Sequence, residues 1–237
     1  MESYDNPFVV AETSGAVQAS FYRKAYGLAA LAFIAWAGVL GALFFTGAYL
    51  PICNFALGSG RFGWLIVLGL FWVGTSVAQN LAFSQSSRLA QYAGLALYIF
   101  AEAVIFVPLI ALVAARTSGD IMQILAPAGA VTGLLAFALT ATVFMTRTDF
   151  SFLRTAVTIG SFAALGAIIL FSVFGINPGS WFSLAMIVLM SAAILWQTWQ
   201  VKEKYAPDQY VGAAVVIFAG FMTLLWYVIQ LFLNRRN

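Results

Sequence analysis

One carboxylate stands out among the residues that could do chemistry, because it lies inside a long apolar stretch. Glu102 is near the middle of the run from Leu89 to Ala115, and no other Asp, Glu, Lys or Arg occupies the middle of such a run in this chain. If the run crosses a bilayer, a charge at that depth costs at least about 2.5 kcal/mol. We therefore expect Glu102 to face a bundle interior and to be protonated or paired, either on an ion pathway or as a neutral hydrogen-bonding group between helices.

Two amides near the end of another apolar run form a second polar feature. Gln197 and Gln200 are three residues apart, so they share a helix face, with Trp196 and Trp199 beside them. They could line the mouth of a pathway, and we include Gln197 among the candidate pathway residues. The alternative is a polar helix end that approaches the membrane interface at Lys202.

Proline and glycine add two expectations about the helix backbones. Pro108 follows Glu102 by six residues, and it would free a backbone carbonyl about one turn before itself. Such a break can line a cavity, but it also occurs in membrane helices without a transport role, so both interpretations stay open. Gly129 and Gly133 form a Gly-x-x-x-Gly pair, which predicts close helix packing within the bundle rather than dimerisation.

The residue inventory excludes several kinds of chemistry. The chain has no histidine, which removes His-ligated haem or zinc and any Ser-His or Cys-His nucleophile. Its one cysteine, Cys53, cannot form an internal disulfide. The last apolar run, from Tyr210 to Leu233, lacks the lysine that a retinal Schiff base requires. We predict a protein that is not an enzyme and has no cofactor or bound metal.

The composition indicates where these residues lie. Of the 237 residues, 63% are hydrophobic and 8% are charged, against roughly 25% charged in a soluble domain. The mean hydropathy of +0.96 agrees, because lipid must solvate most outward-facing side chains. The eleven Lys and Arg residues form no patch, so nucleic-acid binding is not supported. The predicted partner is the lipid bilayer, and the oligomeric state stays open.

The apolar runs predict an all-α membrane protein with a bundle of seven transmembrane helices. A run of about 20 apolar residues spans the hydrocarbon core at about 1.5 Å per residue. We expect a polar N-terminal tail over 1–24, a transmembrane domain over 25–233 and a short C-terminal tail over 234–237. The predicted spans cover residues 25–50, ending at Pro51, then 62–83, 89–115, 121–145, 152–174, 181–201 and 210–233.

The distribution of positive charge predicts the orientation. Seven Lys and Arg residues fall on the side of the N-terminus: Arg23, Lys24, Arg88, Arg147, Arg154, Lys202 and Lys204. Four fall on the other side: Arg61, Arg116, Arg235 and Arg236. Because cytoplasmic loops are enriched in Lys and Arg, we expect a cytoplasmic N-terminus in a multi-pass membrane protein, in the inner or plasma membrane if the protein is bacterial.

Three segments resemble the Bax inhibitor-1 family, also called the transmembrane Bax inhibitor motif family. The start of the first span, from Phe21 to Leu28, reads FYRKAYGL, and the segment from Phe100 to Pro108 reads FAEAVIFVP, including the Glu and the Pro. The junction between spans four and five, from Thr148 to Leu153, reads TDFSFL and is the most specific of the three. The chain is similar to a divergent, bacterial-type member, and the resemblance implies the same seven helices.

The resemblance implies either a pH-sensitive calcium leak or a regulatory role in cell survival and membrane-protein quality control. Members with the leak carry two aspartates in the last two spans that share a proton. The matching positions are Gln197 and Gly220, neither of which is acidic, so gating by a carboxylate pair is not expected. Calcium binds 6–8 oxygens, which Glu102 cannot supply alone, so calcium is expected at most as a weakly held permeating ion.

Two functional hypotheses result. In the first, the protein is a calcium or cation leak channel with Glu102 on the path. In the second, it is a non-conducting membrane regulator of membrane-protein quality control or cell survival that acts through other membrane proteins. The absence of a second buried acid at Gln197 or Gly220 shifts weight toward the regulator without deciding between the two.

Overall fold

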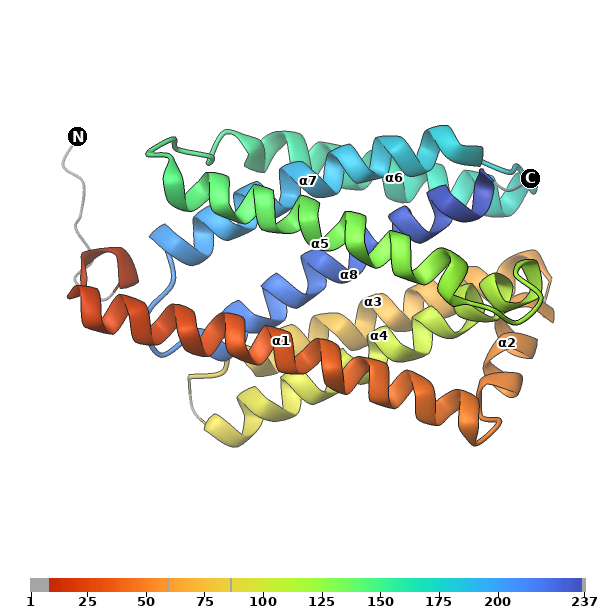
Figure 1. Cartoon of the computed structure of the whole chain (residues 1–237), viewed down its shortest axis with the longest axis horizontal. Helices are drawn as coiled ribbons and strands as arrows, with labels where there is room; N and C mark the ends of the chain where they lie inside the picture. The colour runs from red at the N-terminus through yellow and green to blue at the C-terminus, as the bar shows by residue number, and fades with distance from the viewer. Residues whose placement is uncertain (1–8, 59, 86, 236–237) are drawn as a thin grey trace.

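The part of the chain that the computed structural model describes, residues 9–58, 60–85 and 87–235, is helical and contains no β-strand. Figure 1 shows the helices as an elongated bundle with nearly all helices running lengthwise. A short 3-10 helix, η1 (Val10–Glu12), precedes the α-helices. These are α1 (Gly15–Phe45), α2 (Tyr49–Gly58), α3 (Arg61–Ala82), α4 (Arg88–Arg116), α5 (Met122–Met145), α6 (Leu153–Phe174), α7 (Gly179–Glu203) and α8 (Tyr210–Asn234).

The prediction of a seven-helix membrane bundle is confirmed. Among the described residues, every α-helix except α2 is long and apolar enough to cross a membrane. For six of the seven spans the predicted bounds agree closely with those of the helices, because polar turns separate these spans. The span predicted over residues 89–115, for example, is α4 (Arg88–Arg116). The 22 residues of α3 extend about 33 Å, enough for the hydrocarbon core.

The first span differs from the prediction at both ends. Helix α1 begins at Gly15 rather than at Ala25, because polar side chains do not stop a helix whose first turns project beyond the apolar layer. It ends at Phe45, before Gly47, whose φ of +78° ends the helical path. Pro51 does not end the span; it lies in the first turn of α2, where a helix needs no backbone N–H donor.

Helices α4 and α8 form the centre of the bundle. In the most apolar stretch of each, 61% of the residues are buried, against 11% to 22% in the other five spans. Helix α4 packs against α1, α2, α3 and α8, while α8 packs against α1, α5 and α7 as well. Figure 1 shows α8 crossing the middle of the bundle. A residue halfway along α4 is therefore surrounded by protein.

A glycine brings α3 and α4 into backbone contact. A Cβ atom on Gly94 would lie 2.5 Å from both Ala78 O and Ala82 N, and both alanines are buried. Small residues at such positions let membrane helices approach closely. The close packing predicted for Gly129 and Gly133 is wrong, because a Cβ atom on either would meet nothing within 4 Å; both lie on an open face of α5.

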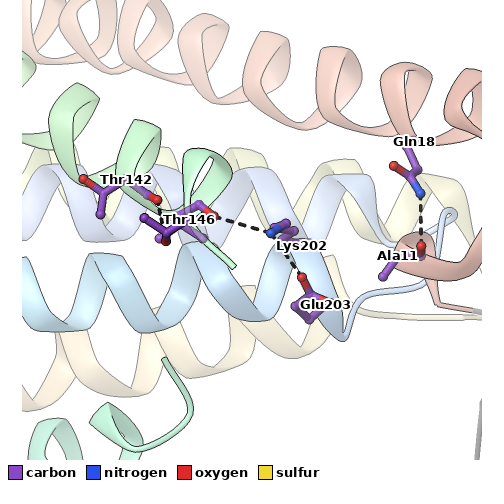
Figure 2. A network of polar contacts seen from close by, with 7 residues as sticks. Ala11, Gln18, Thr142, Thr146, Lys202 and Glu203 are labelled. Atoms are coloured by element: carbon purple, nitrogen blue, oxygen red, sulfur yellow. Dashed lines mark hydrogen bonds and ion pairs between the residues drawn. The ribbon is translucent and has the colours of Figure 1, made fainter. Parts of the chain in front are cut away.

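The N-terminal segment is attached to the bundle over the residues described. Val10 is fully buried, and its N–H donates to Tyr205 O at 2.8 Å, in the loop between α7 and α8. Gln18 in the first turn of α1 donates from Nε2 to Ala11 O at 3.1 Å (Figure 2). Part of the predicted polar tail is thus structured. Residues 1–8 of that tail and Arg236 at the other end lie outside the described residues.

Candidate functional site

Helix α4 places Glu102 at the middle of the bundle. The helix begins after Ser87, whose side chain accepts a hydrogen bond from Ala90 N at 3.4 Å, and it runs to Arg116 at the opposite end. Glu102 lies midway along these 29 residues and is only 3% exposed. The structure therefore confirms that its side chain faces the interior of the bundle.

Two polar side chains lie near the carboxyl group of Glu102. Tyr98 precedes Glu102 by one turn on α4 and is also buried, and its hydroxyl group is close to the carboxyl group. The side chain of Gln79 on α3 is in turn close to the hydroxyl group of Tyr98. The buried acid therefore has polar neighbours on both α3 and α4, as a polar group in a membrane interior requires.

Glu102 also lines a cavity of about 330 Å³. Helices α3, α4, α6, α7 and α8 form its walls, and Glu102 is the one Asp, Glu, Lys or Arg among its described lining residues. The other polar side chains in the lining include Ser172, Thr223 and Gln230. The lining also includes Ile176 and Pro178 of the α6–α7 turn, both of which are exposed. The cavity therefore extends from the middle of the bundle to the end opposite the N-terminus.

Most of the cavity wall is aromatic. Trp64 and Trp226 stack with ring centroids 6.0 Å apart, and Phe106 meets Trp226 edge to face at 5.1 Å. Phe182 packs against Tyr227 at 6.1 Å on another part of the wall. The cavity is therefore mostly apolar, with a carboxyl group at its deep end.

A packed aromatic layer lies between the cavity and the N-terminal end of the bundle. Phe218, one turn before the cavity residue Met222 on α8, is fully buried. Its ring contacts Phe33 at 5.1 Å and Tyr98 at 6.2 Å, so α1, α4 and α8 meet there. In this conformation the cavity is a pocket open toward one end of the bundle.

Gln197 and Gly220 meet across the contact between α7 and α8. A Cβ atom on Gly220 would lie 2.8 Å from Gln197 Oε1 and 3.2 Å from Ile194 Cγ1. Neither Gln197 nor Gly220 lines the cavity that contains Glu102. The two positions that match the family's aspartates are thus adjacent to each other and separate from the cavity.

Pro108 does not line the cavity either. Helix α4 continues through it without a break, and the cavity residues Ile105 and Phe106 lie in the turn before it. The interpretation of Pro108 as a cavity-forming break is therefore not supported. The cavity lies instead between α4 and the lining residues of α3, α6, α7 and α8.

The sequence analysis missed the aromatic wall, although a signal for it was present. Thr223, Trp226, Tyr227 and Gln230 follow the spacing i, i+3, i+4, i+7, which places them on one face of α8. On α3, the spacing i, i+4, i+7 likewise places Trp64, Leu68 and Phe71 on one face of the helix. In a chain so rich in aromatics, however, such faces are common, and only the packing shows which of them meet.

The N-terminal end of the bundle is held by polar contacts between helices. Figure 2 shows Lys202 of α7 reaching the end of α5, where its Nζ donates to Val143 O at 3.4 Å, while it pairs with Glu203 at 3.3 Å. Arg88 at the start of α4 donates to Asp208 O at 2.9 Å. Arg88 and Lys24 both lie over the ring of Tyr210. The positive residues assigned to this side are thus partly engaged in holding helix ends together.

The TDFSFL segment makes the turn between α5 and α6. Asp149 Oδ1 accepts a hydrogen bond from Ser151 N at 2.7 Å, and this bond holds the pKa of the Asp149 carboxyl below its ordinary value. Phe150 is buried, and its carbonyl accepts from Leu153 N at the start of α6. The segment therefore has a structural role, since it reverses the chain and anchors the turn to the bundle.

These features define a multi-pass integral membrane protein whose central helix carries a buried acid at the end of a cavity. A comparison with protein families matches residues 18–237 to the family described as Inhibitor of apoptosis-promoting Bax1. The chain belongs to this family, the Bax inhibitor-1 family, over nearly its whole length. No curated protein and no solved structure matches it significantly.

Proposed function

We propose that this protein is a low-affinity leak pathway for cations, calcium among them, with Glu102 on the path. The observation that supports the proposal most is the position of Glu102 at the deep end of a cavity that reaches one end of the bundle. A carboxylate there lowers the cost of a cation at the depth where the bilayer opposes it most. The remaining barrier is the layer around Phe218, which must move for ions to cross.

The residues that line the cavity would bind calcium only weakly. Calcium is normally held by 6–8 oxygen ligands, whereas the cavity offers one carboxyl group and a few hydroxyl and amide oxygens. Weak binding is compatible with conduction, because an ion must also leave each site that it occupies. We therefore propose that the protein lets calcium leak through and neither senses nor stores it. We propose no catalytic or cofactor-dependent step.

We also propose that the N-terminus faces the cytoplasm. The end of the bundle that contains Lys24, Arg88 and Lys202 would then lie at the cytoplasmic surface, as the enrichment of positive residues predicts. In that orientation the cavity opens to the opposite side of the membrane. Labelling of single cysteines at the two ends, in cells with and without permeabilisation, tests the orientation.

The leak is tested with purified protein in liposomes that contain a calcium indicator. We expect calcium entry above that of empty vesicles and a reduction of at least about fivefold in Glu102→Gln, since a neutral amide attracts a cation far less than a carboxylate. Glu12→Gln is the matched control, because Glu12 is exposed on η1, and it should conduct as wild type. Flux equal to that of empty vesicles would overturn the proposal.

A second function is favoured by the packed layer at Phe218 and by the absence of acids at Gln197 and Gly220. In this function the protein conducts no ions in any state and acts instead as a regulator that binds other membrane proteins through its lipid-facing helices. Crosslinking in native membranes, followed by identification of the captured proteins, tests this alternative. Recovery of specific membrane partners together with absent flux would favour the regulator, and recovery of the monomer alone would count against it.

A further inference from the structure

The aromatic wall of the cavity and its single carboxyl group suit an organic ligand better than a metal ion. The cavity volume of about 330 Å³ falls at the lower end of the roughly 300–1,000 Å³ typical of small-molecule pockets. Such pockets combine apolar and aromatic walls with a few polar groups that orient the ligand. This cavity has both features.

We propose that the cavity binds an organic ammonium ion of small to medium size, with Glu102 as its counter-ion and the rings around Trp226 as its walls. The carboxyl group and the aromatic walls act on different parts of such a ligand. The positive nitrogen pairs with Glu102 at the deep end. The substituents on the nitrogen contact the faces and edges of the rings.

The ring arrangement fits this class of ligand. Trp226 contacts two other rings of the wall: Trp64, which is nearly parallel to it with centroids 6.0 Å apart, and Phe106, which meets it edge to face at 5.1 Å. Phe106 belongs to the same helix as Glu102 and follows it by four residues, so the acid and this aromatic group share one face of α4. Aromatic faces attract organic cations, and tryptophan attracts them most.

The charge balance disfavours stable binding of the other main classes of ligand. An inorganic divalent ion would leave a net positive charge beside one carboxylate and would lack most of its oxygen ligands. A neutral apolar molecule would make no use of the Glu102 carboxyl group, which would then have to stay protonated in the apolar wall. A monovalent organic cation neutralises Glu102, and its alkyl groups need no oxygen ligands.

Access to the site is available from one end of the bundle. The rim residue Ile176 is 52% exposed on the α6–α7 turn, and Pro178 beside it is exposed too. A ligand can therefore enter without crossing the packed layer at Phe218. The inference does not rest on conduction, because a blind pocket binds such a ligand as well as a pathway does.

The test uses benzyltrimethylammonium, with the purified protein in nanodiscs of zwitterionic lipid and binding measured by isothermal titration calorimetry. We expect saturable binding to wild type and an affinity at least about tenfold weaker for Glu102→Gln, a variant of the same shape. Neopentylbenzene, the neutral molecule of the same shape, should not distinguish wild type from Glu102→Gln. No saturable binding, or equal affinity for Glu102→Gln, would overturn the proposal.

Three variants at two tryptophans locate the site. Trp226→Leu should weaken binding several-fold, while Trp226→Phe, which keeps an aromatic ring, should retain most of it. Trp72→Leu is the matched control, because Trp72 is 72% exposed on the outside of α3 and should leave the affinity unchanged. If Trp72→Leu weakens binding as much as Trp226→Leu, the ligand is not in the cavity. Because no flux is measured, failure here is distinguishable from failure of the leak.

Discussion

The side-chain amide of Gln197 lies directly against the backbone of Gly220, with Oε1 2.8 Å from the point that a Cβ atom on Gly220 would occupy. The absence of a side chain at Gly220 thus makes the room that the longer Gln197 side chain fills between α7 and α8. The two positions, which the family resemblance matches to a pair of aspartates, are therefore complementary in size here, and neither carries a charge.

Gly220→Ala should be less favourable when Gln197 is present than when it is absent. The new methyl group would displace Gln197 Oε1, the far end of a flexible side chain, so the cost should be small and comparable to the helix preference of about 0.5–1 kcal/mol for Ala over Gly that offsets it. In the Gln197→Ala background the same change should be neutral or stabilising. Unfolding in detergent for the four proteins of this cycle gives the coupling energy, expected at about 0.5–1 kcal/mol. Additive effects would contradict the contact.

Installing the aspartates should create a pH response. In Gln197→Asp with Gly220→Asp, two carboxyl groups would face each other, and like charges at this distance favour a state that shares one proton. Calcium flux in liposomes should then depend on pH more steeply in the double variant than in wild type. The double asparagine variant, with nearly the same shapes and no titration, is the control and should follow wild type. Identical pH profiles for the two double variants would refute this prediction.

Phe218→Ala should open the barrier between the cavity and the N-terminal end of the bundle. Removing a ring that contacts Phe33 and Tyr98 leaves space in the layer that closes the pocket, so cation flux should rise several-fold if the leak follows this route. The cost in stability is about 3–5 kcal/mol, so folding must be checked by gel filtration. Phe162→Ala is the control, since Phe162 is 72% exposed on the outer face of α6. Unchanged flux in a folded Phe218→Ala protein would exclude this route.

Gly94→Ala should be much more harmful than Gly129→Ala. A Cβ atom on Gly94 would press on the backbone of α3 at Ala78 and Ala82, which cannot move aside as a side chain can, and we expect a loss of about 2–3 kcal/mol. Gly129 faces open space on α5, so alanine there should be neutral or slightly stabilising. Thermal unfolding of both variants checks this difference, and equal melting temperatures would show that α3 and α4 are not in backbone contact.

Asp149 should contribute a pH-dependent stability to the turn between α5 and α6. Its bond from Ser151 N lowers the pKa of the folded carboxyl below the value of about 3.9 for an unfolded chain. The contribution is therefore present above about pH 4 and is lost as the pH falls through the folded pKa. The melting-temperature difference between wild type and Asp149→Asn, which does not titrate, should shrink on acidification. A difference that is constant with pH would contradict this role.

Most of the architecture could be predicted from the order of residues, because a bilayer leaves few choices. A run of about 20 apolar residues must form a helix to satisfy its backbone, and polar turns such as the one after Met145 end each span. The start of α1 was missed because a helix can extend beyond the lipid without an apolar pattern. The separate α2 was missed because Pro51 suits a helix start as well as a helix end.

The sequence by itself determined the seven-span membrane fold, the depth of Glu102 and the absence of acids at Gln197 and Gly220, because these depend on local composition and on spacing along single helices. Only the tertiary structure decided that Glu102 shares a cavity with Trp226, that Gln197 fills the space beside Gly220, and that Phe218 lies in the packed layer between this cavity and the N-terminal end of the bundle. Those relationships depend on which face of each helix meets which neighbour. In a chain that is apolar on almost every helix face, the periodicity of apolar residues does not specify which faces meet. The close packing of individual side chains specifies it instead.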